Sequence, residues 1–257
     1  MIGDVTRRLL ALLVLVACLS GGAPAASARA PACTSPRFVT SDPDGMWSDG
    51  RYLLHNNMWN IDGYLVSETL SACSHRSWYV DATADDTAGD GAVKTYPNVH
   101  VDFHDWDSGQ EPPLASFRSV TSRFAARTPG SGAYDAAYDV WLDGVPGEHE
   151  VMVWTDWRGQ RPAGEVVARH RFGKHRWALW ASDDNSYLAF VPDRRLTRGR
   201  LDLGRMLGWL VDRGHLPADT TVGQVCFGFE IVSTDGRPAR FTVRDFSLRV
   251  RRGGPGV

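Results

Sequence analysis

Acidic residues occur in short segments in which polar and apolar side chains alternate. In a β-strand, residues two apart point to the same face. In the segment 149–155 this groups Glu150, Met152 and Trp154 on one face, with Val151 and Val153 on the other. The valine face suits a core between two sheets. A carboxylate, a thioether and an indole in a row instead indicate a ligand cleft.

Two further segments place an acid in the same setting. Asp139 shares a face with Trp141, and Glu230 lies between apolar neighbours that point the other way. The three acids are therefore candidates for one concave surface. The alternative interpretation is that each is a solvated strand residue.

Paired carboxyl groups across a groove can cleave a glycosidic bond, one as nucleophile and one as proton donor. The donor must hold its proton near neutral pH, which burial and a neighbouring charge can arrange. Indole faces stack on the apolar face of pyranose rings, and the chain has 10 tryptophans. The residues by themselves thus indicate a β-glycan cleft, without naming the glycan or establishing catalysis.

The elements that must position these acids are mostly strands. Eight segments rich in Val, Tyr, Trp, Phe and Ile are separated by turn residues: 50–57, 77–81, 134–143, 149–155, 176–181, 187–192, 224–233 and 241–250. This spacing is typical of an all-β, two-sheet antiparallel sandwich or jelly roll. Loops are predicted at 108–113 and 128–132. The tail from residue 251 is expected to fray, with 253–257 disordered.

One stretch has helical rather than strand periodicity. Its apolar residues recur at helical spacing and precede a glycine stop, Gly214: Leu203, Met206, Leu207, Leu210 and Val211. We therefore expect one helix against the two sheets.

Composition excludes some classes of function. The chain has 257 residues, with 28 Lys and Arg against 30 Asp and Glu, a formal net charge of −2. No basic excess points to nucleic acid or an anionic membrane surface. No C-x-x-C motif or histidine cluster indicates a metal site, and we expect no cofactor. Residues 29–252 are predicted to form a single catalytic domain.

The N-terminus has the pattern of a secretory signal peptide. Arg7 and Arg8 precede an apolar run, 9–17, that is too short for the ~20 residues of a membrane span. Ala-Ser-Ala at 26–28 fits cleavage before Arg29, so that 1–28 is the signal. The segment 15–18, ending in Cys18, instead resembles a bacterial lipobox, and Cys18 would then carry a lipid. Both cleavage sites predict export of the protein. Contact with a membrane is expected only if Cys18 is lipidated.

Three cysteines follow the signal segment: Cys33, Cys73 and Cys226. Export favours a disulfide, and an odd number leaves one thiol free. Cys226 lies in an apolar strand-like run, where a buried thiol behaves as a small hydrophobe. We therefore expect Cys33 to pair with Cys73.

The motifs resemble those of glycoside hydrolase family 12, the compact jelly-roll endoglucanases related to the concanavalin A-like sandwiches. Five segments match in family order, between about residues 52 and 250: His55–Asn60 (HNNMWN), Val93–Val99 (VKTYPNV), Ala137–Leu142 (AYDVWL), Glu150–Trp154 (EVMVW) with its Pro-x-Gly follow-on at 162–164, and Gly228–Ile231 (GFEI). Each motif alone is a weak signal, and their order makes chance agreement unlikely.

The resemblance implies roles for individual residues. Glu150 corresponds to the nucleophile, Glu230 to the general acid/base, and Asp139 to the neighbour that hydrogen-bonds the nucleophile. Five residues correspond to the substrate-binding set, four of them on the donor side of the cleft: Asn57, Trp59, Met152 and Trp154, together with Pro162. The Cys33–Cys73 pair corresponds to the family's N-terminal disulfide.

Three positions depart from the family pattern. Val232 occupies a position, two residues after the acid/base, where the family usually has an aromatic residue. Asn60 stands where glycine is usual, and the segment 104–107 (His-Asp-Trp-Asp) has no family counterpart. Val232 puts the acceptor-side platform in question, although it leaves the catalytic pair in place.

The sequence thus predicts a secreted, monomeric, retaining endo-β-1,4-glucanase that acts on soluble β-glucans, with cellulose-type, mixed-linkage and xyloglucan backbones as candidates. A non-catalytic β-glucan-binding jelly roll is the alternative, although a pure binder has no use for a buried carboxylate pair. A lipid-anchored cell-wall structural protein is a third reading, which rests on Cys18 alone.

Overall fold

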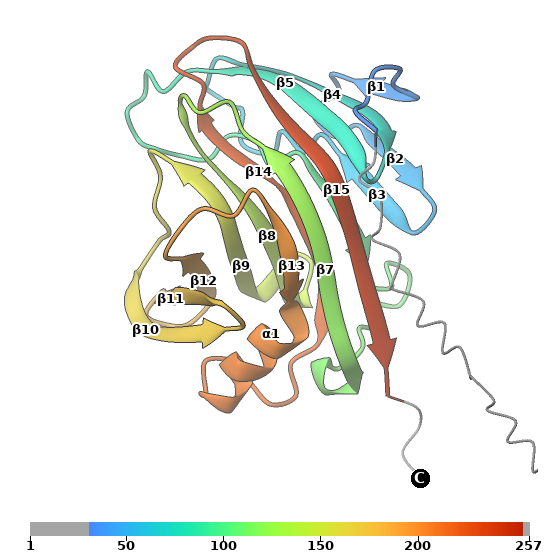
Figure 1. Ribbon diagram of the computed structural model, residues 1–257, viewed down its shortest axis with the longest axis vertical. Helices are drawn as coiled ribbons and strands as arrows, with labels where there is room; N and C mark the ends of the chain where they lie inside the picture. Colours follow the sequence, from blue (N-terminus) through green and yellow to red (C-terminus); the bar gives the residue numbers. More distant parts are fainter. Residues whose placement is uncertain (1–30, 254–257) are drawn as a thin grey trace, which may run out of the picture.

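The computed structural model describes residues 31–253, which form two β-sheets packed face to face (Figure 1). The predicted signal segment, including Cys18, lies outside the described residues, as do residues 254–257. Within the described range there is one α-helix, α1 (Leu203–Asp212), and one short 3-10 helix, η1 (Leu114–Ser116). Neither is long and apolar enough to cross a membrane.

The smaller sheet has six strands in the described part of the chain. Their order is β1 (Phe38–Thr40), β4 (Val66–Ser74), β5 (Ser77–Ala84), β15 (Ala239–Arg252), β7 (Phe117–Arg127) and β13 (Arg198–Asp202).

The larger sheet has nine described strands, and it carries all three candidate acids. Their order is β10 (Glu165–Phe172), β11 (His175–Ala181), β12 (Tyr187–Pro192), β9 (Gly147–Arg158), β8 (Ala133–Gly144), β14 (Val222–Ser233), β6 (Asn98–Asp102), β3 (Tyr52–His55) and β2 (Met46–Asp49). Neighbours pair antiparallel except for β12 and β9, which are parallel. The predicted antiparallel two-sheet fold with one helix is confirmed.

The core lies between the sheets, and strand alternation fills it as expected. Val151 and Val153 are at most 1% exposed. Phe227 of β14 stacks on Phe246 of β15 with ring centroids 5.8 Å apart. Burial of apolar surface, worth roughly 25 cal/mol per Å², therefore holds one face of each sheet inside. The opposite face of the larger sheet is left for a ligand.

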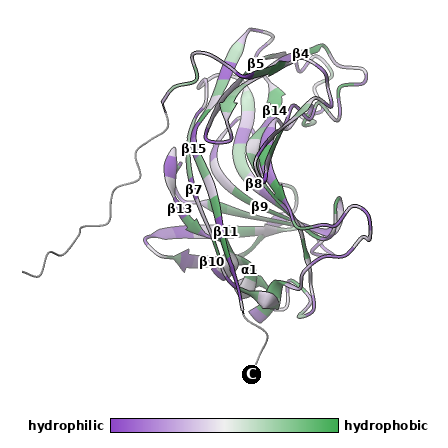
Figure 2. Ribbon diagram, turned by 90° about the vertical axis from the view of Figure 1, so that its right-hand side faces the viewer, coloured by the Kyte–Doolittle hydropathy of each residue, from purple (hydrophilic) through white to green (hydrophobic). Residues whose placement is uncertain are grey.

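The larger sheet curves strongly around this free face (Figure 2). A bulge lies between β8 and β9: Ala136 pairs with Asp156 but Ala137 pairs with Trp154, so Thr155 is the extra residue. The Thr155 hydroxyl donates to the Ala136 carbonyl at 2.8 Å. A bulge bends its strand and redirects side chains, so the strands rise on both sides of a concave floor.

Helix α1 forms where the periodicity predicts it. The Asp202 carboxylate accepts the backbone N–H of Arg205 at 3.1 Å, which caps the first turn. Gly214, just past the helix, has φ of +74°, a conformation that suits glycine. Four of the five predicted apolar residues are buried: Leu203, Met206, Leu207 and Leu210.

The sequence located eight strands and missed seven. The eight predicted segments all contain a strand, whereas β1, β2, β4, β6, β7, β10 and β13 were not predicted. These missed strands are short or rich in Ser, Thr and Arg, so their apolar signal is weak. The expected fraying at residues 251 and 252 was wrong, because β15 continues through both and pairs there with Ser119 and Phe117 of β7.

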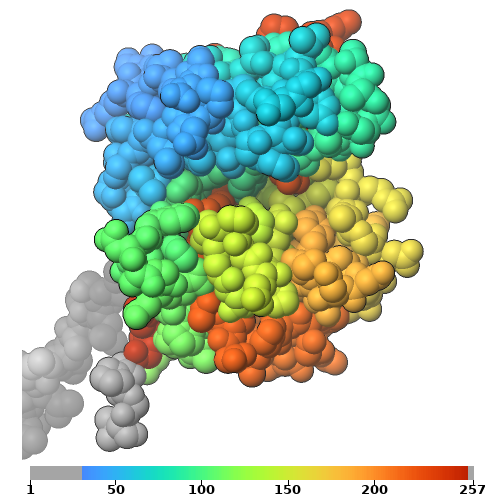
Figure 3. All heavy atoms as spheres, turned by 180° about the vertical axis from the view of Figure 1, so that it is seen from behind, coloured from blue at the N-terminus to red at the C-terminus, as the bar shows by residue number. Residues whose placement is uncertain are grey.

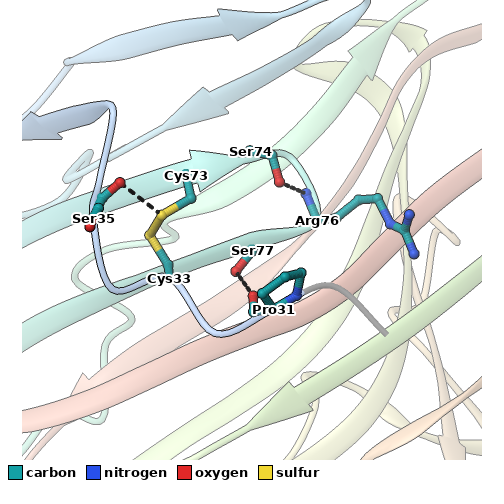
Figure 4. The surroundings of a disulfide bond; sticks show 7 residues. All are labelled: Pro31, Cys33, Ser35, Cys73, Ser74, Arg76 and Ser77. Atoms are coloured by element: carbon teal, nitrogen blue, oxygen red, sulfur yellow. Dashed lines mark hydrogen bonds between the residues drawn. A yellow bond between two sulfur atoms is a disulfide. The ribbon is translucent and has the colours of Figure 1, made fainter. Parts of the chain in front are cut away.

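A disulfide joins Cys33 to Cys73, with Cα atoms 5.5 Å apart, which confirms the predicted pairing (Figure 4). It ties the segment before β1 to β4. The Ser77 hydroxyl donates to the Pro31 carbonyl at 2.6 Å beside it. Cys226 is the one free cysteine among the described residues, and it is buried as expected.

Candidate active site

A cleft of about 1130 Å³ lies on the concave face of the larger sheet. Figure 3 shows it as a groove between the blue and cyan N-terminal segments above and the green and yellow-green segments below. The cleft is lined by all three candidate acids and by two of the predicted binding residues: Asp139, Glu150, Glu230, Asn57 and Trp59. Tyr96 of the Val93–Val99 motif lines it as well, so residues from all five motifs meet in one place.

The two glutamates enter the cleft from strands on either side of β8. Glu150 of β9 pairs with Trp141 of β8, and Glu230 of β14 pairs with Asp135 of β8. These two β8 positions are six residues apart, so the glutamates stand toward opposite ends of the curved strand. Because the sheet is concave, the carboxyl groups approach from opposite walls.

The pKa values of these acids are raised, first of all by burial. Burial raises the pKa of Glu150 to about 8, and the charge of Glu230 contributes to the rise. Burial likewise raises the pKa of Glu230. The pKa of Asp139, which is 5% exposed, lies well above its ordinary value because of burial and then the charges of Glu150 and Glu230. The site therefore retains protons near neutral pH.

Glu230 has two polar neighbours that favour its charged form. The side-chain amide of Gln160 donates to Glu230 Oε2 at 3.4 Å. Asp135 supplies a second hydrogen bond, and both bonds lower the pKa of Glu230 against the effect of burial.

Asp135 was not predicted as a site residue. It is fully buried, and among the described residues no N–H or hydroxyl donor reaches either of its carboxyl oxygens. Burial and the charge of Glu230 raise the pKa of Asp135 well above its usual range. A hydrogen bond between two carboxyl groups needs a proton, and Asp135 is the group that holds it. The sequence does contain a signal for it: Asp135 lies four residues before Asp139 on the same strand, so both side chains point to the same face.

Asn57 and Trp59 lie on the wall that carries Glu230. Asn57 has φ of +44°, and its side-chain amide donates to the Tyr96 carbonyl at 3.2 Å. The neighbouring Thr95 forms an antiparallel bridge with Ile231, next to Glu230. Trp59 is 62% exposed and lines the cleft. Trp59 therefore offers an exposed indole to the cleft, and its assignment to the donor half stays a prediction.

Met152, Trp154 and Pro162 lie elsewhere than expected. Met152 and Trp154 are each 1% exposed, Pro162 is buried, and none of the three belongs to the cleft lining. The Met152 sulfur accepts hydrogen bonds from Trp154 Nε1 at 3.4 Å and from the Tyr187 hydroxyl at 3.3 Å. Tyr187 is the residue that reaches the cleft surface. Met152 and Trp154 thus belong to a small apolar cluster against which Tyr187 packs, and contact of the three residues with substrate stays a prediction.

Several residues that line the cleft were not predicted from the sequence. Tyr96 lines the cleft and donates its hydroxyl proton to the Ala137 carbonyl at 3.1 Å. His100, on the floor, contacts Asn98 Oδ1 through Nδ1 at 2.8 Å, and burial lowers its pKa to about 4. It is thus a neutral polar group at ordinary pH. Val232 stands where the family usually has an aromatic residue, and it is only 3% exposed. This position therefore offers no stacking surface to a sugar.

No metal site accompanies the acids. Within residues 31–253, no group of three or more His, Cys, Asp or Glu side chains is arranged to hold a metal ion. What the arrangement can do chemically is acid/base and nucleophilic work by carboxyl groups.

Comparisons with known proteins agree with this geometry. The model of glycosyl hydrolase family 12 matches residues 50–251. Endoglucanase S of Pectobacterium parmentieri is 25% identical over 227 residues, covering 77% of this chain and 83% of that protein. A probable xyloglucan-specific endo-β-1,4-glucanase A of Aspergillus fumigatus is 26% identical over 222 residues, covering 81% and 90%.

Solved structures share the fold. The xyloglucanase domain of NopAA from Sinorhizobium fredii, solved with cellobiose, has a TM-score of 0.73 at 24% identity, covering 84% of this chain and 100% of that chain. Endoglucanase cel12A from Rhodothermus marinus has a TM-score of 0.71 at 22% identity, covering 84% and 99%.

Proposed function

Because the chain belongs to glycosyl hydrolase family 12, we propose that Glu150 and Glu230 are the residues with which it hydrolyses its substrate. The activity itself is endo-acting, retaining hydrolysis of β-1,4-glucosidic bonds in glucans, as in its endoglucanase relatives. The observation that carries the residue assignment is that both glutamates line one cleft from strands on either side of β8.

In the first step Glu150 attacks the anomeric carbon of the donor sugar while Glu230 protonates the departing oxygen. The glycosidic C–O bond breaks, and a bond from the sugar to the Glu150 carboxylate forms. In the second step Glu230 takes a proton from water, which attacks the same carbon and releases Glu150. A retaining site needs the two carboxyl groups ~5–5.5 Å apart, and this separation is expected here.

Electrostatics supports a shared proton in the pair. Burial raises the pKa of both glutamates, and the charge of Glu230 raises that of Glu150 further. Like charges in one site favour a state with one group protonated and one ionised, and the first step proceeds from the form in which Glu230 carries that proton. Once Glu150 is esterified its charge is gone, so Glu230 can ionise more easily and act as the base. The choice of Glu150 as nucleophile rests on the resemblance of its Glu-x-Met-x-Trp strand.

The remaining roles follow from position. Asp139 lies on β8 between the two glutamates, and its proton would be shared with the nucleophile. Asn57 and Trp59 would hold the donor sugars on the Glu230 wall. Met152 and Trp154 would hold Tyr187 in place at the cleft surface, and a contact of Pro162 with substrate remains a prediction.

The substrate is expected to be a soluble β-1,4-linked glucan outside the cell. Export through the N-terminal signal and a monomeric state remain predictions, as does lipidation at Cys18. The alternative, a binder without turnover, is disfavoured because crowding several partly or fully buried carboxyl groups at one site costs free energy that binding a neutral glucan would not recover.

A substrate panel tests the function. The protein is incubated with carboxymethyl cellulose, mixed-linkage β-glucan and xyloglucan, and reducing ends and viscosity are followed together. An early loss of viscosity with few new reducing ends indicates endo action, and NMR of the first products should show the β-anomer. Retention of these glucans on the protein without release of reducing ends would support the binder instead.

A further inference from the structure

Trp106 belongs to a segment that the family motifs leave unexplained. It lies in the loop 103–111, which follows β6 and contains the His-Asp-Trp-Asp sequence. Trp106 is 62% exposed and lines the cleft. A large exposed indole at the edge of a binding groove is a feature expected of a ligand contact rather than of a core.

The loop is built to hold this ring in place. The Asp105 carboxylate accepts the backbone N–H groups of Asp107 at 3.0 Å and Ser108 at 2.9 Å. The N–H groups of Phe103 and His104 both donate to the Gly223 carbonyl on the neighbouring strand, at 2.7 and 2.9 Å. The backbone on either side of Trp106 is therefore fixed before substrate arrives, which reduces the entropy cost of binding.

The indole itself is also held. Its Nε1 donates to Asp102 Oδ2 at 3.3 Å, and its ring meets His104 edge-on with centroids 4.8 Å apart. His104 contacts Glu111 Oε1 at 2.7 Å. The ring thus has support at one edge and at its NH, and it remains mostly open to the cleft.

Trp106 stands on the wall opposite Trp59. Strand β6 crosses the cleft floor from Asn98, next to His55 and Gly228, to Asp102, next to Gln224. The Trp59 segment lies at the Asn98 end, where Asn57 contacts Tyr96, and the Trp106 loop continues from the Asp102 end. In Figure 3 the corresponding blue and green segments face each other across the groove.

The exposure of Trp106, compared with that of the cleft floor, favours contact with a branch over contact with the main chain. The floor between the walls is made of buried groups, with His100 4%, Cys226 1% and Asp139 5% exposed. A glucan backbone must lie low to reach the catalytic acids. Successive units of a β-1,4-linked chain face opposite ways, so substituents on O6 point alternately to the two walls. A ring standing at the rim meets such a substituent.

We infer that Trp106 is a stacking platform for a sugar linked to O6 of the glucan backbone, so that this cleft is adapted to a branched β-1,4-glucan. The Asp102 carboxylate and the Gln224 amide, both in the cleft lining, would hydrogen-bond the branch hydroxyls. The inference rests on the proposed function, since it assigns the substrate class of that same cleft.

The test compares kcat/KM on xyloglucan, which carries O6 branches, with kcat/KM on unbranched mixed-linkage β-glucan. Trp106→Ala should lower the ratio of the two roughly tenfold, the effect of losing one stacking contact, and Trp106→Phe should restore part of it. Trp59 is equally exposed, but it stands where the family resemblance implies contact with the donor sugars of the main chain, so Trp59→Ala should lower both values together. Leu65→Ala, which removes an exposed apolar side chain outside the cleft lining, should leave the ratio at the wild-type value.

Thermal unfolding of each variant separates folding from binding, because a shared loss of Tm would lower both activities alike. An equal loss on the two substrates in well-folded Trp106→Ala would overturn the inference, since the ring would then contact the main chain. Wild-type values on both would overturn it as well. If the wild-type protein hydrolyses neither glucan, it is the proposed function that fails first.

Discussion

Glu150 and Glu230 face the cleft from strands on either side of β8, and the charge of one affects the proton of the other. Their different roles give different chemical outcomes when each is removed. The nucleophile is needed in both half-reactions, whereas the acid/base is needed most where the leaving group is poor.

Replacing each glutamate by alanine should distinguish the roles. Glu150→Ala should lose at least about 10³-fold in kcat on every glucan, and azide should rescue it to give a glycosyl azide of inverted configuration from an activated substrate. Glu230→Ala should still cleave an aryl glycoside with a good leaving group, and azide should give the retained product. Product configuration is read by NMR. Exchanged configurations would reverse the assignment, and full activity in both variants would place the catalytic pair elsewhere.

Asp135 should act through Glu230, as a positioning residue. Protonated Asp135 donates to ionised Glu230 and lowers its pKa, so Asp135→Ala should move the alkaline limb of kcat/KM upward by about one pH unit. Asp135→Asn keeps a donor and should leave the limb near its wild-type position. The charges of Glu150 and Asp139 also raise the pKa of Asp135, and the nearby Tyr96 and Tyr187 hydroxyls stay neutral because burial raises their pKa values. A limb that stays in place in well-folded Asp135→Ala would reduce Asp135 to a packing role.

At the scale of elements, β4 is held to the segment before β6 by a buried acid. Glu68 of β4 is 3% exposed and accepts a hydrogen bond from the Thr95 hydroxyl at 2.8 Å. Its other carboxyl oxygen has no hydrogen-bond partner among the described residues. Thr95 in turn bridges to Ile231 beside Glu230. A residue of the smaller sheet therefore supports one wall of the cleft.

Burial should make Glu68 a source of pH-dependent stability. Its pKa in the folded protein is raised to about 8 from an ordinary 4.5, so the folded state binds a proton that the unfolded state releases. Stability from this group is complete below about pH 4.5 and is lost as the pH rises through 8. Glu68→Gln should remove this dependence, with a relative gain of up to roughly 5 kcal/mol above pH 8. Urea unfolding between pH 5 and 9 measures it, and parallel curves for the two proteins would contradict it.

At the scale of the whole molecule, the cleft exists because the larger sheet bends and distant loops converge on it. The disulfide links the segment that precedes β1 to β4 of the smaller sheet, and its two cysteines are 40 residues apart in the sequence. Closing a loop of this size stabilises a protein by about 2–4 kcal/mol. The disulfide thus adds to the stability of a fold in which burying the acids of the cleft costs free energy.

Thiol labelling should confirm the covalent state. Denatured but unreduced protein lacking residues 1–28 should carry one reactive thiol, that of Cys226, and Cys226→Ser should carry none. After reduction the Tm should fall. Three reactive thiols in the unreduced wild type would refute the bridge.

The pattern of apolar and acidic residues was enough to assign the face of each strand that carries the acids. Alternation with period two is a local property of extended chain, so Glu150, Asp139 and Glu230 could be assigned to the concave face from their neighbours alone. The helix and the Cys33–Cys73 pair were equally accessible, one from its 3.6-residue period and the other from the apolar surroundings of Cys226.

How these faces meet depends on the folded molecule. The bulge at Thr155, the curvature of the sheet and the register that sets Asp135 beside Glu230 depend on packing between segments distant in sequence. The same packing buried Met152 and Trp154 against Tyr187, and it left Trp106 exposed at the edge of the cleft. The position of a residue along a strand determines which face of the sheet its side chain points to. How deeply that side chain is buried depends on which other segments of the chain pack over it.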